Sequence, residues 1–122
     1  MCKTILVAED DLTISGLIRE IVERKGFKAV IAHNGAEAYE EFKKNKFDLL
    51  ITDLKMPKID GIDLIKMVRE KDRVIPIVII TGYGSEKNLV LAKSFGVSKI
   101  LMKPCSVLDI SDALDYTLKP PE

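Results

Sequence analysis

Five short apolar runs alternate with five stretches of helical periodicity along this chain of 122 residues. An unbroken apolar run is typical of a strand covered on both faces, whereas apolar residues spaced by three and four indicate a helix with one buried side. The expected strands are residues 4–9, 28–32, 48–53, 76–81 and about 98–102. The expected helices run from Ile14 to a stop at Gly26, over about 36–45, from Gly61 onward, over about 85–95 and over about 106–118. This alternation predicts a doubly wound α/β domain, in which helices wrap both faces of a parallel sheet.

Two of these segments carry clear signs of how they are buried. The run PIVIIT at residues 76–81 is the most apolar of the five, so we expect it to be the central strand. In the last helix, Ser106 followed by Asp109 has the spacing of a capping box. The side chains that we expect this helix to bury are Val107, Ile110, Leu114 and Leu118.

The composition is that of one globular domain, and it does not indicate a strongly charged surface for binding a charged partner. Lys plus Arg and Asp plus Glu each number 19, so the formal net charge is zero. Because no basic block stands out, DNA binding by this chain alone is not expected. We expect a single domain over residues 1–122, in which 119–122 form a tail or the start of a linker.

The chain shows neither a signal-peptide pattern nor an apolar run of membrane-spanning length. A cytoplasmic protein without membrane contact is therefore expected. Cys2 and Cys105 lie far apart without metal-ligand spacing, and we interpret them as small apolar residues in a reducing compartment. A nucleotide-binding enzyme is excluded because the chain has neither a GxxxxGK(S/T) loop nor a GxGxxG motif.

Charged and hydroxyl side chains follow the ends of the predicted strands. Glu9 and Asp10 end the first strand, Asp53 the third and Thr81 the fourth, and Lys103 follows the fifth. In doubly wound sheets ligands bind beyond the carboxyl ends of the strands, where the strand order reverses. If the first and third strands are neighbours at that point, the three carboxylates converge.

Converging carboxylates repel one another unless a cation neutralises them. All-oxygen ligands select a hard ion such as Mg²⁺, which usually also binds a phosphate oxygen. Lys103 and the Thr81 hydroxyl would then bind further phosphoryl oxygens, and such positioning with charge neutralisation is most of what phosphoryl transfer needs. A carboxylate beside the metal can itself be the nucleophile and form an aspartyl phosphate.

Plainer interpretations exist for several acidic residues and for the single histidine. Taken alone, Asp53 could be interpreted as the cap of a turn. Asp11 is better interpreted as a helix N-cap than as a metal ligand. Asp60 with Gly61 has the chemistry of a turn. His33 lies in an Asn-Gly turn without charged neighbours, so we expect a surface residue and not a phosphorelay histidine.

Four motifs stand in register at successive strand ends. They are ILVAEDD with Glu9 and Asp10, TDLKMPKIDG with Asp53, PIVIITG with Thr81, and KILMKP with Lys103 and Pro104. Together they resemble the receiver domain of bacterial two-component response regulators, the family of the chemotaxis regulator, and the resemblance covers essentially the whole chain. It implies a flavodoxin-like fold with five helices and strand order 2-1-3-4-5.

The resemblance implies that Asp53 accepts a phosphoryl group from a sensor histidine kinase or a histidine phosphotransfer protein. Mg²⁺ would be the cofactor, bound directly by Asp10, Asp53 and the backbone carbonyl of Lys55, with Glu9 acting through a metal-bound water. Such a protein is a signalling switch and not an enzyme, since it catalyses only its own phosphorylation and slow self-dephosphorylation.

The resemblance also implies how the modification is read. Thr81 would hydrogen-bond the phosphoryl group and Lys103 would form an ion pair with it. A cis peptide bond before Pro104 would aim Lys103 into the site. Phosphorylation would change affinity for a downstream partner or output domain at the face formed by the fourth helix, fifth strand and fifth helix.

Some positions depart from the family pattern. Many receivers have Tyr or Phe three residues before the lysine, where this chain has Ile100, so output would depend on Thr81 and backbone shifts instead of an aromatic rotamer. Lys55 and Tyr83 stand two residues after Asp53 and Thr81, at positions that tune water access in the family. Because both side chains are long, we expect a long-lived phosphoryl group.

Two other functions stay open on the sequence. A receiver-like module that binds its partner without phosphorylation has Ile100 as its only support. A Mg²⁺-dependent phosphatase with an aspartyl nucleophile usually needs a second carboxylate two residues after the nucleophile, where this chain has Lys55.

Overall fold

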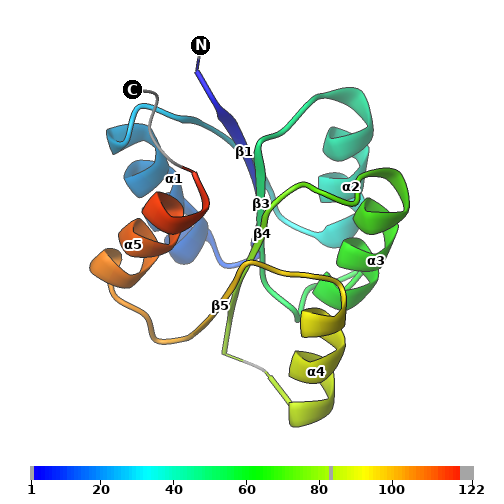
Figure 1. The fold of residues 1–122 in the computed structure, drawn as a ribbon. Helices are drawn as coiled ribbons and strands as arrows, with labels where there is room; N and C mark the ends of the chain where they lie inside the picture. Colours follow the sequence, from blue (N-terminus) through cyan, green and yellow to red (C-terminus); the bar gives the residue numbers. More distant parts are fainter. Residues whose placement is uncertain (1, 83, 119–122) are drawn as a thin grey trace.

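The computed structural model describes residues 2–82 and 84–118, which form a five-stranded parallel sheet between two layers of helices (Figure 1). The strands are β1 (Thr4–Ala8), β2 (Lys28–Ala32), β3 (Leu49–Thr52), β4 (Ile77–Thr81) and β5 (Lys99–Met102). The helices are α1 (Leu12–Arg24), α2 (Gly35–Lys44), α3 (Gly61–Lys71), α4 (Glu86–Ser94) and α5 (Val107–Thr117). The order across the sheet is β2-β1-β3-β4-β5, so the predicted flavodoxin-like topology is confirmed.

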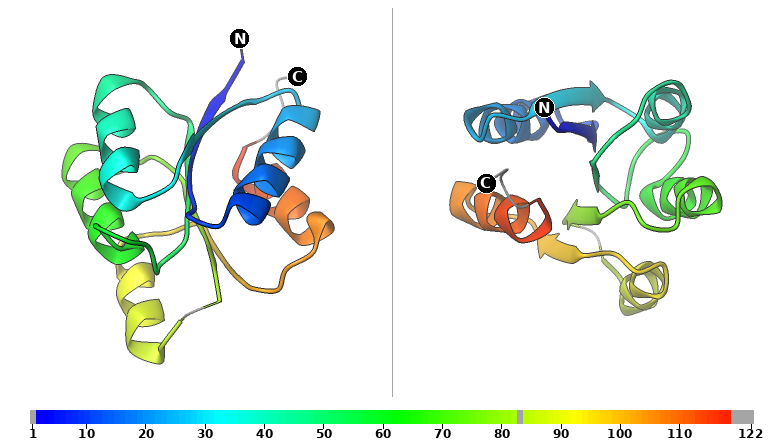
Figure 2. Two further views of the ribbon diagram at one scale, coloured as in Figure 1. Left: turned by 180° about the vertical axis from the view of Figure 1, so that it is seen from behind. Right: turned by 45° about the horizontal axis from the view of Figure 1, so that its top comes forward.

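The helices divide between the two faces of the sheet: α1 and α5 cover one face, and α2, α3 and α4 cover the other (Figure 2). Alternate residues of each strand enter two separate cores, because successive side chains point to opposite faces. On β1, Ile5 and Val7 join the core with α1 and α5, whereas Leu6 and Ala8 join the core with α2 and α3. Coverage on both faces leaves every residue of β3 and β4 buried.

The most apolar strand, β4, is not the central one, so that prediction is wrong. It pairs with β3 on one side and with β5 on the other, and β3 occupies the middle of the sheet. The apolar run at residues 76–81 reflects burial on both faces, which β3 shares. Such burial does not distinguish the central strand from an inner neighbour.

The last helix, α5, begins with the predicted capping box but buries a different set of side chains. The Ser106 hydroxyl accepts a hydrogen bond from the Asp109 amide and the Asp109 carboxylate accepts one from the Ser106 amide, both at 3.1 Å. Val107 is 52% exposed, because the first turn borders a hollow beside α1 and not the core, so its predicted burial is wrong. The residues buried by α5 and its C-cap are Ile110, Ala113, Leu114 and Leu118.

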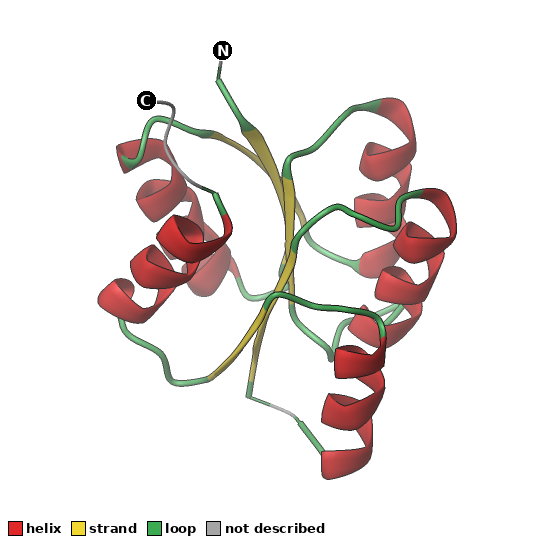
Figure 3. Cartoon of the chain, viewed as in Figure 1, coloured by secondary structure: helices red, strands yellow, loops and turns green. Residues whose placement is uncertain are grey.

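The carboxyl ends of the strands meet at one edge of the sheet, from which the loops to the helices leave (Figure 3). Polar caps start the helices there: Asp11, Asn34, Asp60 and Ser85 accept hydrogen bonds from first-turn amides of α1, α2, α3 and α4. Asp11 is thus the N-cap that the sequence predicts, and Asp60 caps α3 in addition to its role in the turn. Within the described residues, no helix has the length and apolar content to cross a bilayer.

Candidate functional site

Two buried carboxylates lie side by side at this edge because β1 and β3 are neighbours. Ala8 pairs with Thr52 in the sheet register, and the Asp53 amide donates to the Ala8 carbonyl oxygen at 3.1 Å. Glu9 and Asp53 therefore leave the sheet at the same level. Glu9 is 2% exposed and Asp53 is 7% exposed, so both carboxyl groups lie in a setting where an unpaired charge is unfavourable.

Lys103 follows the edge strand β5 and reaches these carboxylates across the end of β4. Its ammonium nitrogen lies 2.7 Å from Glu9 Oε1 and 2.7 Å from Asp53 Oδ2. Its backbone amide donates to the Thr81 carbonyl oxygen at 2.8 Å, which fixes the start of the β5–α5 loop against the end of β4. The Lys103–Pro104 peptide bond is cis, in agreement with the expectation from sequence.

Asp10 completes an acidic cluster that suits a hard divalent cation. One carboxylate oxygen from each of Glu9, Asp10 and Asp53 lies within 4.8 Å of the other two. The three carboxylates carry −3 when ionised and Lys103 adds +1, which leaves −2. Carboxylate oxygens with that residual charge fit Mg²⁺, which is bound by one or two carboxylates together with other oxygen ligands.

The electrostatics of the cluster depend on Lys103. Burial raises the pKa of the Glu9 carboxyl, and the hydrogen bond from Lys103 opposes this effect only in part. Burial lowers the pKa of Lys103, but the hydrogen bonds to Asp53 and Glu9 outweigh it, so the net shift is upward. Lys103 is therefore an ammonium ion at neutral pH, and its hydrogen bond favours the ionised form of Glu9 against the effect of burial.

The loop between β3 and α3, which carries Lys55, lies so close to two glycines that neither position has room for a side chain. A Cβ atom at Gly61 would lie 2.0 Å from the Asp53 carbonyl oxygen, and one at Gly35 would lie 2.0 Å from the Ile59 carbonyl oxygen. The backbone of α2 therefore lies directly against this loop. The sequence assigned both glycines to turns, Gly61 after Asp60 and Gly35 after Asn34, because a glycine in such a place carries no signal of a contact with a distant loop.

The other described residues that the sequence singles out do not belong to the acidic cluster. Thr81 is buried at the end of β4, and the Lys55 amide donates to Asp53 Oδ1 at 3.3 Å. Ile100 is half-buried and packs with the core under α2, α3 and α4. Tyr83 lies outside the described residues.

His33 is exposed, as predicted for a surface turn residue, and its Nδ1 lies 3.4 Å from the Glu9 carbonyl oxygen. Asp11 makes its two side-chain hydrogen bonds to the amides of Thr13 and Ile14. These contacts engage Asp11 in helix capping and leave Glu9, Asp10 and Asp53 as the carboxylates of the cluster.

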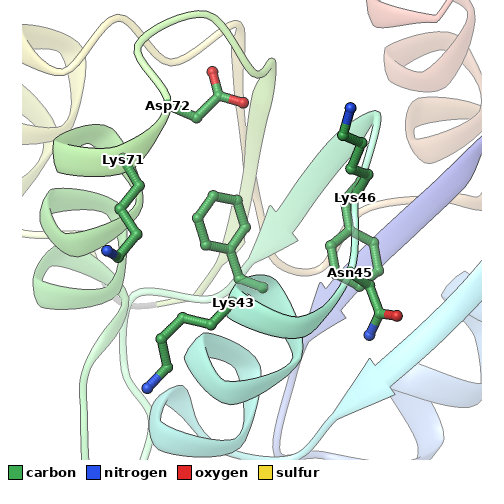
Figure 4. Close-up of a pocket in the computed structure, with 7 residues that line it drawn as sticks. Lys43, Asn45, Lys46, Lys71 and Asp72 are labelled. Atoms are coloured by element: carbon green, nitrogen blue, oxygen red, sulfur yellow. The ribbon is translucent and has the colours of Figure 1, made fainter.

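A hollow of about 550 Å³ lies away from this cluster, at the carboxyl ends of α2 and α3 (Figure 4). The residues around it are Phe42, Lys43, Asn45, Lys46, Phe47, Lys71 and Asp72. Lys43 pairs with Glu40 at 2.8 Å, and the Asp72 carboxylate accepts from the amides of Val74 and Ile75. Lysines in the last turns of helices offset the negative end of the helix dipole, which accounts for Lys43 and Lys71 at this hollow.

The sequence matches the family of response regulator receiver domains over residues 5–115. It is 36% identical over 100 residues to the transcriptional regulatory protein CpxR of Escherichia coli strain K12, which covers 82% of this chain and 42% of that protein. It is 31% identical over 119 residues to the alkaline phosphatase synthesis transcriptional regulatory protein PhoP of Bacillus subtilis strain 168, with 98% and 50% covered. The chain thus spans half the length or less of these curated relatives.

Solved structures of response regulator proteins have a similar fold. The CheY-like response regulator receiver domain protein from Methanospirillum hungatei JF-1 superposes with a TM-score of 0.90 at 26% identity, over 94% of this chain and 92% of that one. The chemotaxis protein CheY4 of Vibrio cholerae superposes with a TM-score of 0.89 at 25% identity, over 97% and 100%.

Proposed function

The chain belongs to the response regulator receiver domain family of two-component signalling, and we propose that Asp53 is the residue on which it accepts a phosphoryl group. The observation that carries the proposal is the convergence of Asp53 with Glu9, Asp10 and Lys103. Asp53 is the member of the acidic cluster that both contacts Lys103 and lies at the end of the middle strand, where its backbone is anchored on both sides.

In the proposed reaction a carboxylate oxygen of Asp53 attacks the phosphorus atom of a phosphohistidine. The P–N bond breaks, its electron pair goes to the imidazole nitrogen, and an aspartyl phosphate forms. Lys103, 2.7 Å from Asp53 Oδ2, is placed to offset the negative charge that the phosphoryl oxygens bring. The chain would thus act only on itself, in its own phosphorylation and slow self-dephosphorylation.

Asp10, Asp53 and the backbone carbonyl of Lys55 would hold Mg²⁺, with Glu9 acting through a bound water. When bound, the cation neutralises charge on the phosphoryl oxygens. Lys103 contacts the same carboxylates, so its ammonium offsets part of the charge of Glu9 and Asp53 until the cation binds. Thr81 would donate its hydroxyl to the phosphoryl group.

The readout would take place at the face of α4, β5 and α5. Four exposed large side chains support this choice: Val90, Leu91, Met102 and Tyr116. An apolar surface of this kind favours a protein partner. The phosphoryl donor would be a sensor histidine kinase or a histidine phosphotransfer protein, and the switch would operate in the cytoplasm.

The decisive experiment is intact-mass measurement after incubation with Mg²⁺ and acetyl phosphate. We expect a single phosphoryl adduct on the parent, none on Asp53→Asn, and none when Mg²⁺ is chelated beforehand. Asp63→Asn removes an exposed carboxylate from α3 and is the matched control, which should keep the adduct. A folded parent that takes no adduct would favour the alternative function, a module that binds its partner without phosphorylation.

A further inference from the structure

The guanidinium of Arg69, in the last turn of α3, joins the end of α4 to the loop before β4. Its Nε donates to the Phe95 carbonyl oxygen at 2.7 Å and its Nη2 to that of Gly96 at 3.3 Å. Its Nη1 donates to the carbonyl oxygens of Ile75 at 2.7 Å and Asp72 at 3.2 Å. One side chain therefore holds three segments together through four backbone carbonyls.

These bonds use the shape of the guanidinium as well as its charge. Within the described residues Arg69 forms no salt bridge, and its hydrogen-bond partners are all backbone oxygens. Burial lowers the pKa of Arg69, an effect that Asp72 opposes, but an arginine stays charged in proteins. The planar fork spreads five donors over three nitrogens in fixed directions, whereas the three donors of a lysine all lie on one nitrogen.

The helix that Arg69 holds, α4, buries little apolar surface of its own. Ala92 is its one buried residue among those described, and Val90 and Leu91 are 62% and 40% exposed. By comparison, α3 buries four residues: Gly61, Leu64, Ile65 and Val68. Ala92 and the partly buried Leu89 pack into the core, and polar contacts at the ends of α4 add to this small apolar contact.

The carboxyl end of α4 is fixed by several contacts. The Phe95 amide bonds to the Ala92 carbonyl at 3.1 Å, and the Gly96 amide bonds to the Lys93 carbonyl at 3.0 Å. Gly96 has φ +73°, a left-handed conformation that closes a helix and that glycine adopts without strain. The two bonds from Arg69 are added to this closure.

The amino end of α4 has a local cap instead. The Asn88 amide donates to the Ser85 hydroxyl at 3.2 Å and the Leu89 amide donates to the Ser85 carbonyl at 3.0 Å. This end follows Thr81 by a few residues, whereas the carboxyl end is the one beside α3 (Figure 1). The carboxyl end is therefore bonded to a side chain of another helix, whereas the cap at the amino end comes from Ser85.

We propose that Arg69 is a positioning residue that fixes the carboxyl end of α4, so that phosphorylation moves the helix at its amino end only. The inference rests on the proposed function, because the signal starts at Asp53 and reaches α4 through Thr81. With one end fixed, a displacement near Thr81 becomes a tilt of the exposed side chains on α4. Without Arg69, the same displacement would shift the whole helix.

Amide hydrogen exchange followed by NMR tests the proposal, with beryllofluoride and Mg²⁺ as the phosphoryl mimic. The amides of Asn88 and Leu89 report the amino end of α4, and those of Phe95 and Gly96 report the carboxyl end. In the parent we expect the mimic to change the amide exchange rates at the amino end of α4 by about tenfold. The rates at the carboxyl end should change by less than about twofold. An equal change at both ends would overturn the proposal, and this arm needs no variant.

Arg69→Met keeps the length of the stem and removes the fork. We expect exchange at Phe95 and Gly96 to rise about tenfold even without the mimic. Arg73→Met, the same change at an exposed arginine nearby, should leave those amides as in the parent. Unchanged exchange at Phe95 and Gly96 in Arg69→Met would overturn the proposal.

If Asp53 is not the phosphoryl acceptor, the experiments give a result that differs from failure of the Arg69 proposal. A parent that takes no phosphoryl adduct and responds to the mimic at neither end would contradict the role of Asp53. The comparison of Arg69→Met with the parent would still decide whether Arg69 holds the helix. Arg69→Met should itself take the adduct, since Arg69 lies outside the acidic cluster.

Discussion

Lys103 and Glu9 are 94 residues apart in the sequence, yet the Lys103 ammonium lies 2.7 Å from the Glu9 carboxylate. The same nitrogen is 2.7 Å from Asp53, so one cation serves two buried carboxylates that face each other across neighbouring strands. Lys103 thus offsets part of the negative charge of the cluster and links the electrostatics of the site to the stability of the fold.

Replacing Lys103 with Met should destabilise the protein and make it depend on Mg²⁺. Both carboxylates lose their partner, and breaking a buried ion pair typically lowers the free energy of unfolding by about 3 kcal/mol or more. Because the uncompensated cluster should bind a divalent cation more tightly, Mg²⁺ should raise the melting temperature of Lys103→Met more than that of the parent. Thermal unfolding with and without Mg²⁺ measures both effects. Lys66→Met, at an exposed lysine on α3, is the control, and an equal Mg²⁺ response in all three proteins would contradict this account.

The raised pKa of Glu9 predicts a specific pH dependence. The folded-state pKa of Glu9 lies above the ordinary glutamate pKa of 4.5, so the folded protein binds a proton at Glu9 more readily than the unfolded chain does. The contribution of Glu9 to stability is therefore fully present below pH 4.5 and is lost as the pH rises through the folded-state pKa. Glu9→Gln should unfold at a higher temperature than the parent at pH 7 without Mg²⁺, and the difference should shrink on acidification. Melting curves of Glu9→Gln and the parent across this pH range test the prediction. If Glu9→Gln is less stable than the parent at pH 7, the bond from Lys103 to Glu9 outweighs the cost of burying the carboxylate.

Gly35 should be needed for metal binding although it contributes no side chain. A Cβ atom there would lie 2.0 Å from the Ile59 carbonyl oxygen, so Gly35→Ala must displace the β3–α3 loop that carries Lys55. We expect a loss of about 1–3 kcal/mol in unfolding free energy, as for other overpacked sites, and a weaker affinity for Mg²⁺. Calorimetric titration with Mg²⁺ gives the second quantity.

Gly16→Ala is the control for Gly35→Ala, because nothing lies within 4 Å of a Cβ atom at Gly16 in α1. Alanine should stabilise that helix by about 0.5–1 kcal/mol and leave Mg²⁺ affinity unchanged. A second comparison is Val68→Ala, which weakens the core of α3 without touching the loop. If Gly35→Ala loses no more Mg²⁺ affinity than Val68→Ala at a similar loss of stability, the glycine has no particular role in the site.

The aspartyl phosphate should survive for minutes or longer. Lys55 is exposed, with its amide bonded to Asp53 Oδ1, so its long side chain starts beside the carboxylate whose phosphoryl group water must reach at the phosphorus atom. Lys55→Ala and Tyr83→Ala should each shorten the lifetime, whereas Lys66→Ala should not. Decay of the mass adduct after removal of acetyl phosphate provides the measurement. A parent half-life of seconds would refute the prediction.

The sequence is informative where function places chemistry at the ends of buried strands. Glu9, Asp10, Asp53, Thr81 and Lys103 could each be found because a charge or hydroxyl directly follows or ends an apolar run. The topology then brings four of these strand ends to one edge of the sheet.

The residues that sequence reasoning missed act through space and not through local pattern. Gly35 matters because α2 lies against a loop more than twenty residues further along the chain, and Arg69 because its fork reaches the end of α4. Val107 has the spacing of a buried residue but stands in a first turn beside a hollow. Periodicity gives the face of a helix, but how far along the helix that face is covered depends on its neighbours.

The order of the strands has a consequence for a chain that emerges from the ribosome. β1 and β3 supply Glu9 and Asp53 early in synthesis, but Lys103 follows β5 and leaves the ribosome last among them. A nascent sheet of β1, β2 and β3 would therefore bring two carboxylates together before their cation is available. Because domains fold as units, the completed site waits for residue 103 to emerge, and until then the repulsion between the two carboxylates opposes the pairing of β1 with β3.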